Sequence, residues 1–142
     1  MFHHILQAAQ NFCTHQLGSC SQQIKTLPKT RTLIAYLNIE AQGGEKFHTY
    51  IGCDELLLQA ITEIFLGEET SEMETLNDML LETTNMIIGS AKVLASQTDT
   101  SHFTISTPHL CDHDYDTISP DHFATLLILG GEMSIAIKGD VA

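Results

Sequence analysis

The sequence predicts an α+β fold with two layers, in which long helices cover one face of a mostly antiparallel sheet. Apolar residues recur at helical spacing in three segments, β-forming residues fill two pairs of short segments, and a glycine-containing turn joins each pair. Helices and sheets must bury their apolar sides against another element, so we expect this two-layer α/β (α+β) arrangement. The length of 142 residues fits a single domain over residues 1–142.

The first predicted element is a helix over residues 2–17, because apolar side chains recur there at spacings of three and four. Gly18 is suited to end this helix, since glycine readily adopts the conformation found after helix termini. The mostly polar residues 19–30 are expected to form a loop.

A β-hairpin is expected next, with strands over residues 32–39 and 46–52 that are rich in β-forming side chains. Two adjacent glycines lie in the turn between them. A second helix is predicted over residues 55–65, and Asp54 is expected to be its N-cap residue.

The third predicted helix covers residues 75–94 and follows an acidic linker over residues 68–72. Ser71 and Glu74 have the spacing of a capping box, and acidic groups at this end suit the helix dipole. One side of the helix is apolar and is expected to face the core. Its members lie within about 40° of a common line: Leu76, Leu80, Thr83, Ile87, Ala91 and Leu94.

The last third of the chain is expected to complete the sheet. A short strand over residues 103–106 should end at Pro108, and the polar residues 109–121 should form a loop. Two further strands, over residues 123–129 and 133–138, are predicted to form a second hairpin joined by two glycines.

The side of the third helix opposite its core face carries a narrow polar stripe. Asp78, Glu82, Asn85, Gly89 and Lys92 follow one another at spacings of four, three, four and three. Glycine inside a helix costs about 0.8–1.0 kcal/mol relative to alanine, and Asn is also a poor helix former, so helix stability does not favour these residues. Apolar residues border the stripe: Met79 and Met86 on one side, Leu81 and Ile88 on the other. We interpret this surface as a docking site.

The composition limits the partners and the location of the protein. A formal net charge of −12 argues against nucleic acid and against an anionic membrane surface as partners, because both need a basic footprint, and it suits a partner that offers lysines. No apolar run approaches the ~18 residues of a membrane span, and the N-terminus lacks a secretory signal pattern. We therefore expect a cytoplasmic protein whose four cysteines are free thiols.

The pattern Asp78-x3-Glu82-x2-Asn85, followed after 22 residues by Pro108, resembles the signature of the CheC/CheX/FliY family of phosphatases. Members of this family act on phosphorylated CheY in bacterial chemotaxis. The same helix resembles the family's Glu-x-x-Asn-x-x-x-Gly-Asn-Ala segment, except that Ser90 stands where Asn is common. Only one such helix is present, so the resemblance is closest to CheX and implies a CheC/CheX-like fold.

The resemblance implies a role for each residue of the pattern. Asn85 would orient the attacking water, which suits a carboxamide because it donates and accepts hydrogen bonds without titrating. Glu82 would form a salt bridge with the receiver's active-site lysine, and a spacing of three lets both side chains enter one pocket. Gly89 would let the receiver's loop approach, while Asp78 and Pro108 would support the helix and the neighbouring loop. Mg²⁺ is expected in the partner receiver, so no cofactor or metal of the chain's own is predicted.

The implied partner is a phosphorylated CheY-type receiver domain, and the implied assembly is a homodimer joined through its sheets. An alternative hypothesis is a non-catalytic receiver-binding adaptor or flagellar-switch component that uses the same helix. A third hypothesis is a metal-binding sensor built on His109, Cys111 and His113, although their spacing matches no established zinc motif.

Overall fold

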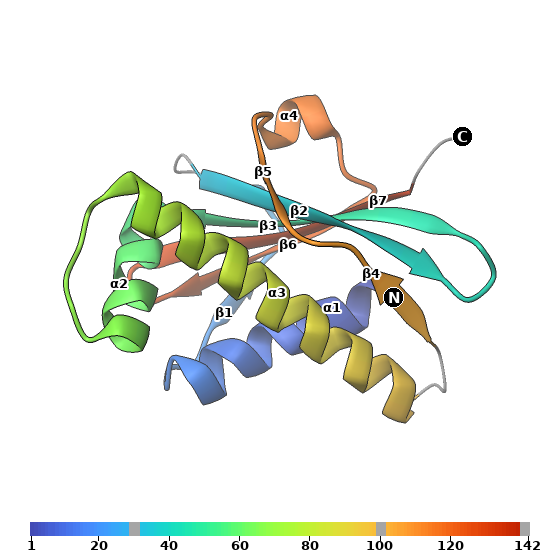
Figure 1. The fold of residues 1–142 in the computed structure, drawn as a ribbon, viewed down its shortest axis with the longest axis horizontal. Helices are drawn as coiled ribbons and strands as arrows, with labels where there is room; N and C mark the ends of the chain where they lie inside the picture. The colour runs from blue at the N-terminus through green and yellow to red at the C-terminus, as the bar shows by residue number, and fades with distance from the viewer. Residues whose placement is uncertain (29–31, 99–101, 140–142) are drawn as a thin grey trace.

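The computed structural model describes residues 1–28, 32–98 and 102–139 (Figure 1). One seven-stranded sheet runs in the order β1-β6-β7-β3-β2-β4, with β5 also paired to β2. Each strand pairing in these ranges is antiparallel. The strands are β1 (Gln22–Ile24), β2 (Thr32–Ala41), β3 (Lys46–Asp54), β4 (Phe103–Ile105), β5 (His109–Cys111), β6 (His122–Ile128) and β7 (Gly131–Gly139).

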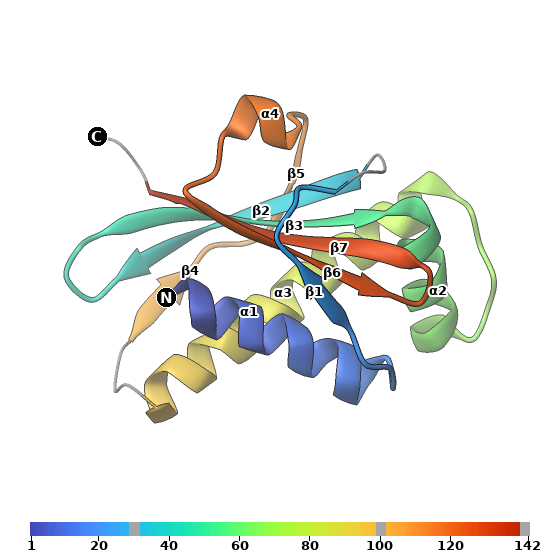
Figure 2. The ribbon, with the colours of Figure 1, turned by 180° about the vertical axis from the view of Figure 1, so that it is seen from behind.

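The long helices lie on one face of this sheet, which confirms the predicted fold class (Figures 1 and 2). They are α1 (Phe2–Asn11), which continues as the π-helical turn η1 (Phe12–Gln16), α2 (Glu55–Leu66) and α3 (Met73–Thr98). α1 and α3 pack against each other across the sheet, whereas α2 packs at the end of β3 and β7. Within the described ranges, no helix is both long and apolar enough to cross a membrane.

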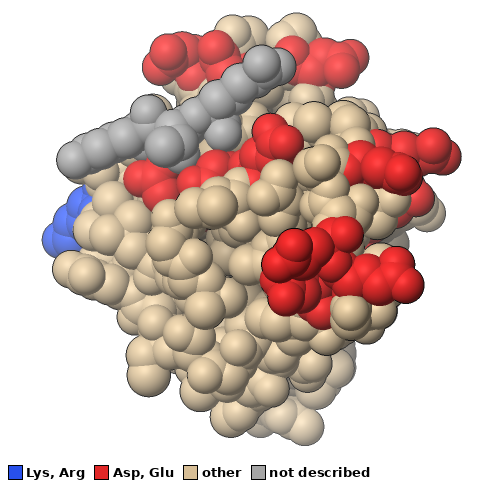
Figure 3. Space-filling model, turned by 90° about the vertical axis from the view of Figure 1, so that its left-hand side faces the viewer, with Lys and Arg blue, Asp and Glu red and all other residues tan. Residues whose placement is uncertain are grey.

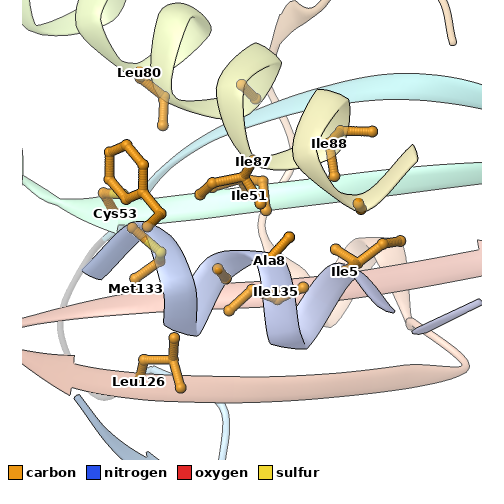
Figure 4. Packing of buried hydrophobic residues seen from close by; sticks show 14 of the residues in the cluster. Ile5, Ala8, Ile51, Cys53, Leu80, Ile87, Ile88, Leu126, Met133 and Ile135 are labelled. Atoms are coloured by element: carbon orange, nitrogen blue, oxygen red, sulfur yellow. The ribbon is translucent and has the colours of Figure 1, made fainter. Parts of the chain in front are cut away.

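The main hydrophobic core fills the space between these helices and the sheet. Figure 4 shows side chains of α1 and α3 pointing toward those of β3, β6 and β7. Because side chains alternate along a strand, only every second residue of each strand reaches this layer. The labelled members are Ile5, Ala8, Ile51, Cys53, Leu80, Ile87, Ile88, Leu126, Met133 and Ile135, all buried.

Three short elements were not predicted from the sequence. β1 lies inside the expected loop 19–30 and pairs with β6. The expected loop 109–121 contains β5 and a four-residue helix, α4 (Tyr115–Ile118), which covers part of the sheet face that the long helices leave open (Figure 1). Asp114 caps α4 by accepting a hydrogen bond of 3.0 Å from the Thr117 N–H.

Tyr115 fastens α4 to the sheet. Its side chain is buried, and its hydroxyl lies 2.5 Å from Ser134 Oγ on β7. Gly52 on β3 leaves the room for this ring, because a Cβ there would lie 2.8 Å from the Tyr115 hydroxyl and 2.5 Å from Ser134 Oγ. The polar segment is therefore held by one buried aromatic residue that periodicity did not identify.

The second hairpin is shifted by one residue from the prediction. Its turn is Leu129–Gly130, with φ of 51° and 76°, rather than the two glycines. Gly131 belongs to β7, where a Cβ would lie only 2.6 Å from Asp54 Oδ1. Asp54 accepts hydrogen bonds from the Leu57 N–H at 2.9 Å and the Glu132 N–H at 3.1 Å. The predicted cap of α2 is thus confirmed, and it also joins α2 to β7.

α3 begins at Met73, two residues before the predicted start. The Leu76 N–H donates to the Glu72 carbonyl at 3.0 Å, so Glu72 rather than Ser71 occupies the cap position. The predicted capping box at Ser71 and Glu74 is therefore wrong by one residue, although acidic residues do surround this helix end.

Candidate functional site

α3 is the element that carries the candidate site. It packs against α1, α2 and the strands β2, β3, β4 and β5, so its inner side is fixed along most of its length. The predicted core face is buried except at Leu94, which is half-buried against the core. This support makes the opposite side of the helix a rigid platform.

The predicted polar stripe lies on the outer side of α3. Asp78, Glu82, Asn85 and Lys92 are exposed, and Gly89 is half-buried. Within the described residues, no hydrogen bond or ion pair engages the side chains of Asp78, Glu82 or Asn85. Glu82 and Asn85 are three residues apart and rise by about 4.5 Å along the helix axis, so both can contact one bound group.

Gly89 has open space above it. A Cβ built at this position meets no heavy atom within 4 Å, and the residue lies inside a regular helix. The fold of this chain therefore does not require glycine here. A close approach by another molecule is a physical reason to keep the position bare.

The apolar margins of the stripe differ from the prediction. Met79 and Ile88 are buried in the core, because α3 is covered on both flanks. Leu81 and Met86 are half-buried and are the two predicted margin residues that reach the surface. Val93, which the sequence interpretation missed, is 54% exposed one turn beyond Gly89. Its spacing of four from Gly89 is the signal that could have identified it.

Pro108 lies in the link between β4 and β5 and is half-buried. The Ser106 N–H donates to the Asn38 carbonyl at 2.9 Å, and the Asn38 N–H donates to Ser106 Oγ at 2.8 Å, so this link is fastened to β2. Both β4 and β5 contact α3. Pro108 is thus at the sheet edge that α3 crosses.

The segment with His109, Cys111 and His113 does not form a metal cluster. Across residues 1–28, 32–98 and 102–139, no group of three or more His, Cys, Asp or Glu residues is placed to hold a metal ion. Cys111 Sγ instead donates to the His113 carbonyl at 3.5 Å, and the His109 ring lies 5.8 Å from that of Tyr36. The arrangement gives no support to the metal-sensor hypothesis.

The stripe is a convex helix surface rather than a pocket. A hollow of about 670 Å³ lies between the start of β2 and residues 110–116. Asn77 is the α3 residue that lines it, and none of the stripe residues does. Because a small substrate needs a concave site that surrounds it, Glu82 and Asn85 are better suited to enter the site of another macromolecule.

Comparison with protein families identifies the chain. A family model described as "Chemotaxis phosphatase CheX" matches residues 35–129, more than half of the sequence. The chain belongs to the CheX family. The matched range includes Asp78, Glu82, Asn85, Gly89 and Pro108. No curated protein sequence gives a significant match.

Solved structures of CheX and related proteins share this fold. Chemotaxis protein CheX from Vibrio vulnificus superposes with a TM-score of 0.78 at 20% identity, over 97% of this chain and 95% of that one. A CheX from Borrelia burgdorferi, solved in a complex with CheY, BeF3 and Mg²⁺, gives 0.69 at 16% identity over 96% of each chain. FliY from Thermotoga maritima gives 0.59 at 16% identity, over 95% of this chain and 84% of that one.

Proposed function

We propose that this CheX-family chain removes the phosphoryl group from the aspartyl phosphate of a CheY-type receiver domain, using the polar stripe of α3. Its family is described as a chemotaxis phosphatase, and a structurally similar CheX was solved with CheY, BeF3 and Mg²⁺. The observation that carries the proposal is an exposed carboxylate and an exposed carboxamide three residues apart on a rigid helix, both unengaged by the described residues.

The reaction is a hydrolysis. The oxygen of a water molecule forms a bond to phosphorus, the bond between phosphorus and the receiver's aspartate oxygen breaks, and its electron pair returns to that carboxylate. The products are inorganic phosphate and the free aspartate, and the water proton is released to phosphate or solvent. The receiver supplies Mg²⁺ and a lysine, so the chain needs only to hold the water in line.

Asn85 is proposed to hold that water, because its carboxamide accepts and donates without changing protonation state. Glu82 is proposed to pair with the receiver's lysine and to fix the orientation of the two proteins. Gly89 gives the clearance for a receiver loop. Asp78 and Pro108 are positioning residues, the first on the preceding turn of α3 and the second at the sheet edge beside it.

We also propose that the chain is a single phosphatase domain that acts in the cytoplasm as a homodimer joined through its sheets. A cluster of three rings on the sheet face opposite the main core, with Tyr36 and Tyr50 half-buried and His109 exposed, supports this assembly. The ring of Tyr36 lies 6.2 Å from that of Tyr50 and 5.8 Å from that of His109. Sedimentation equilibrium over a range of concentrations measures the oligomeric state directly.

The phosphatase and the adaptor hypotheses are separated by two measurements on one receiver. The first is the decay of radiolabelled phosphoryl receiver with and without the chain, and the second is the affinity of the chain for receiver loaded with BeF3 and Mg²⁺. Binding with accelerated decay supports the phosphatase. Binding with a decay rate equal to that of the receiver alone, at saturating chain, would establish the adaptor and overturn the proposal.

A further inference from the structure

The end of the molecule around α2 carries most of the exposed large apolar side chains. Nine such side chains are exposed in the described residues, and six of them lie on α2, at the start of α3 or in the β6–β7 turn. Exposed apolar residues that gather in one area mark an interaction surface, whereas scattered ones do not. These six are Leu56, Ile64, Phe65, Leu66, Met73 and Leu129.

The outward side of α2 has a shape that can receive a side chain. A hollow of about 540 Å³ lies between α2, the residues 69–71 and the β6–β7 turn. Leu56, Ala60 and Leu129 supply its apolar lining, and Glu63 and Glu69 supply carboxylates. Leu56 and Ala60 are four residues apart, so they form one ridge along the helix and the hollow runs beside it.

Leu129 is held in an unfavourable backbone conformation at this hollow. Its φ is 51°, and the next residue, Gly130, has φ of 76°, so both central residues of the two-residue turn are left-handed. This turn favours Asn, Asp or Gly, and a left-handed conformation costs other residues roughly 1–2 kcal/mol. Leu129 is 41% exposed, so a large part of its apolar side chain still faces solvent. Folding stability alone would favour asparagine here.

The charges around the hollow select the partner. Residues 55–74 contain six glutamates and no lysine or arginine, and none of the latter occurs from residue 47 to residue 91. Figure 3 shows this end of the molecule, with carboxylates over its upper and right-hand parts and, among the described residues, Lys or Arg only at the left edge. This negatively charged surface around the hollow repels a second copy of the acidic chain and anionic lipids, and it attracts Lys and Arg side chains.

We propose that this α2 surface, formed by Leu56, Ala60 and Leu129, docks a basic amphipathic helix of a partner protein. A large apolar side chain of that helix fills the hollow, and its flanking Lys or Arg side chains lie beside Glu63 and Glu69. Binding of an amphipathic helix by an apolar groove is a common mode of recognition. The α2 surface contains no residue of the α3 stripe, so this inference does not depend on the proposed phosphatase activity.

The test uses two labelled peptides with leucines at helical spacing, one with lysine at the remaining positions and one with glutamate. Fluorescence anisotropy should show saturable binding of the lysine peptide alone. Leu56→Ser and Leu129→Asn should each weaken it by about tenfold, as expected for central apolar contacts. Leu129→Asn should keep or raise the melting temperature, which separates lost binding from lost folding.

Leu110→Ser is the matched control, because Leu110 is 43% exposed and also lies among carboxylates, near Asp112 and Asp114. It should leave peptide binding unchanged. The proposal is overturned if Leu56→Ser and Leu129→Asn bind like the wild type, or if the glutamate peptide binds equally well. If the wild type forms a dimer that Leu129→Asn does not form, the occupant of the α2 surface is a second copy of the chain and the proposal is overturned. If the wild type binds phosphatidylserine vesicles and Leu129→Asn does not, the occupant is a membrane and the proposal is likewise overturned.

Discussion

Glu82 is exposed on α3, and its proposed role is to contact a lysine of the receiver. Glu82→Gln should lower the affinity for receiver loaded with BeF3 and Mg²⁺ by about tenfold, and Glu82→Lys by more, because a charge pair with lysine is lost or reversed. The loss should shrink as salt is raised, since salt screens exposed charges. Calorimetric titration measures the affinity, with Glu45→Gln in the β2–β3 turn as control. Equal affinities for Glu82→Gln and wild type would refute the role.

Substitution of Gly89 by alanine is expected to raise the stability of the fold and to weaken receiver binding. Gly89→Ala should raise the free energy of unfolding by about 0.8–1.0 kcal/mol, because alanine favours the helix and the added Cβ meets no atom within 4 Å. The same variant should bind the receiver more weakly, since the clearance is lost. Urea denaturation and calorimetry measure the two quantities. A more stable variant with unchanged receiver affinity would show that Gly89 provides no clearance.

Thr83 lies between Glu82 and Asn85 in sequence but points into the core. Its Oγ1 is buried without a hydrogen-bond partner in the described structure, whereas Thr84 Oγ1 donates to the Leu80 carbonyl at 2.8 Å. Thr83→Val should therefore stabilise the fold by about 1 kcal/mol, because an unpaired buried hydroxyl costs about 1–3 kcal/mol. Thr84→Val removes a hydrogen bond and is the matched comparison. Urea denaturation measures both variants. A higher free energy of unfolding for Thr84→Val than for Thr83→Val would contradict this expectation.

Residue periodicity predicted which side of α3 faces outward, since Asp78, Glu82 and Asn85 are all exposed. It could not predict how wide the buried side is. Met79 and Ile88 lie at the edge of the apolar face by helical angle, yet both are buried because α3 has neighbours on both flanks. The width of a buried face is set by packing partners that a helical wheel does not contain.

At the scale of elements, the long periodic segments and the short strand β4 were predictable, whereas β1, β5 and α4 were not. α1 and the β2–β3 hairpin follow from spacing within each segment. β1 has three residues and pairs Gln22 with Leu127, so its signal lies in a strand about 100 residues away. α4 has four residues, and its N-cap residue Asp114 is the only local sequence signal for it. Elements that depend on distant partners carry little local pattern.

α4 is held by Tyr115, which makes its attachment sensitive to alkaline pH. Burial raises the pKa of Tyr115 above its ordinary value of 10.0. The unfolded chain releases the proton near pH 10 while the folded chain keeps it, so stability is retained below that pH and falls as the pH rises above it. Tyr115→Phe should lose about 1 kcal/mol at neutral pH, because the bond to Ser134 is absent, and should fall less steeply above about pH 10.

Urea denaturation of the wild type and of Tyr115→Phe between about pH 7 and 11 measures this difference. Burial also raises the pKa of Cys13, to about 11, and that of Cys53. Both cysteines lower the free energy of unfolding at alkaline pH in the wild type and in Tyr115→Phe alike. The difference between the two curves of stability against pH therefore reports the titration of Tyr115. Parallel curves over the whole range would show that the Tyr115 hydroxyl does not titrate on unfolding.

At the scale of the whole molecule, the fold presents its candidate chemistry on a convex surface. The sheet and α1 hold α3 in place, and among the described residues no member of the α3 stripe lines the hollow beside β2 or the hollow beside α2. The fold class and the stripe were predictable from the sequence, because both follow from spacing. The roles of Asn85 and Glu82 do not follow from spacing or from this structure, since the receiver that would complete the site is a second protein.

A single-turnover measurement of phosphate loss, on a labelled receiver that is fully bound by excess chain, tests whether Asn85 positions the attacking water. We expect Asn85→Ala to lower the rate constant within the complex by about 100-fold or more, toward that of the receiver alone, while its affinity for the receiver is unchanged. Glu45→Ala should match the wild type. If Asn85→Ala, fully bound, releases phosphate as fast as the wild type, the claim that the α3 stripe positions the attacking water is wrong.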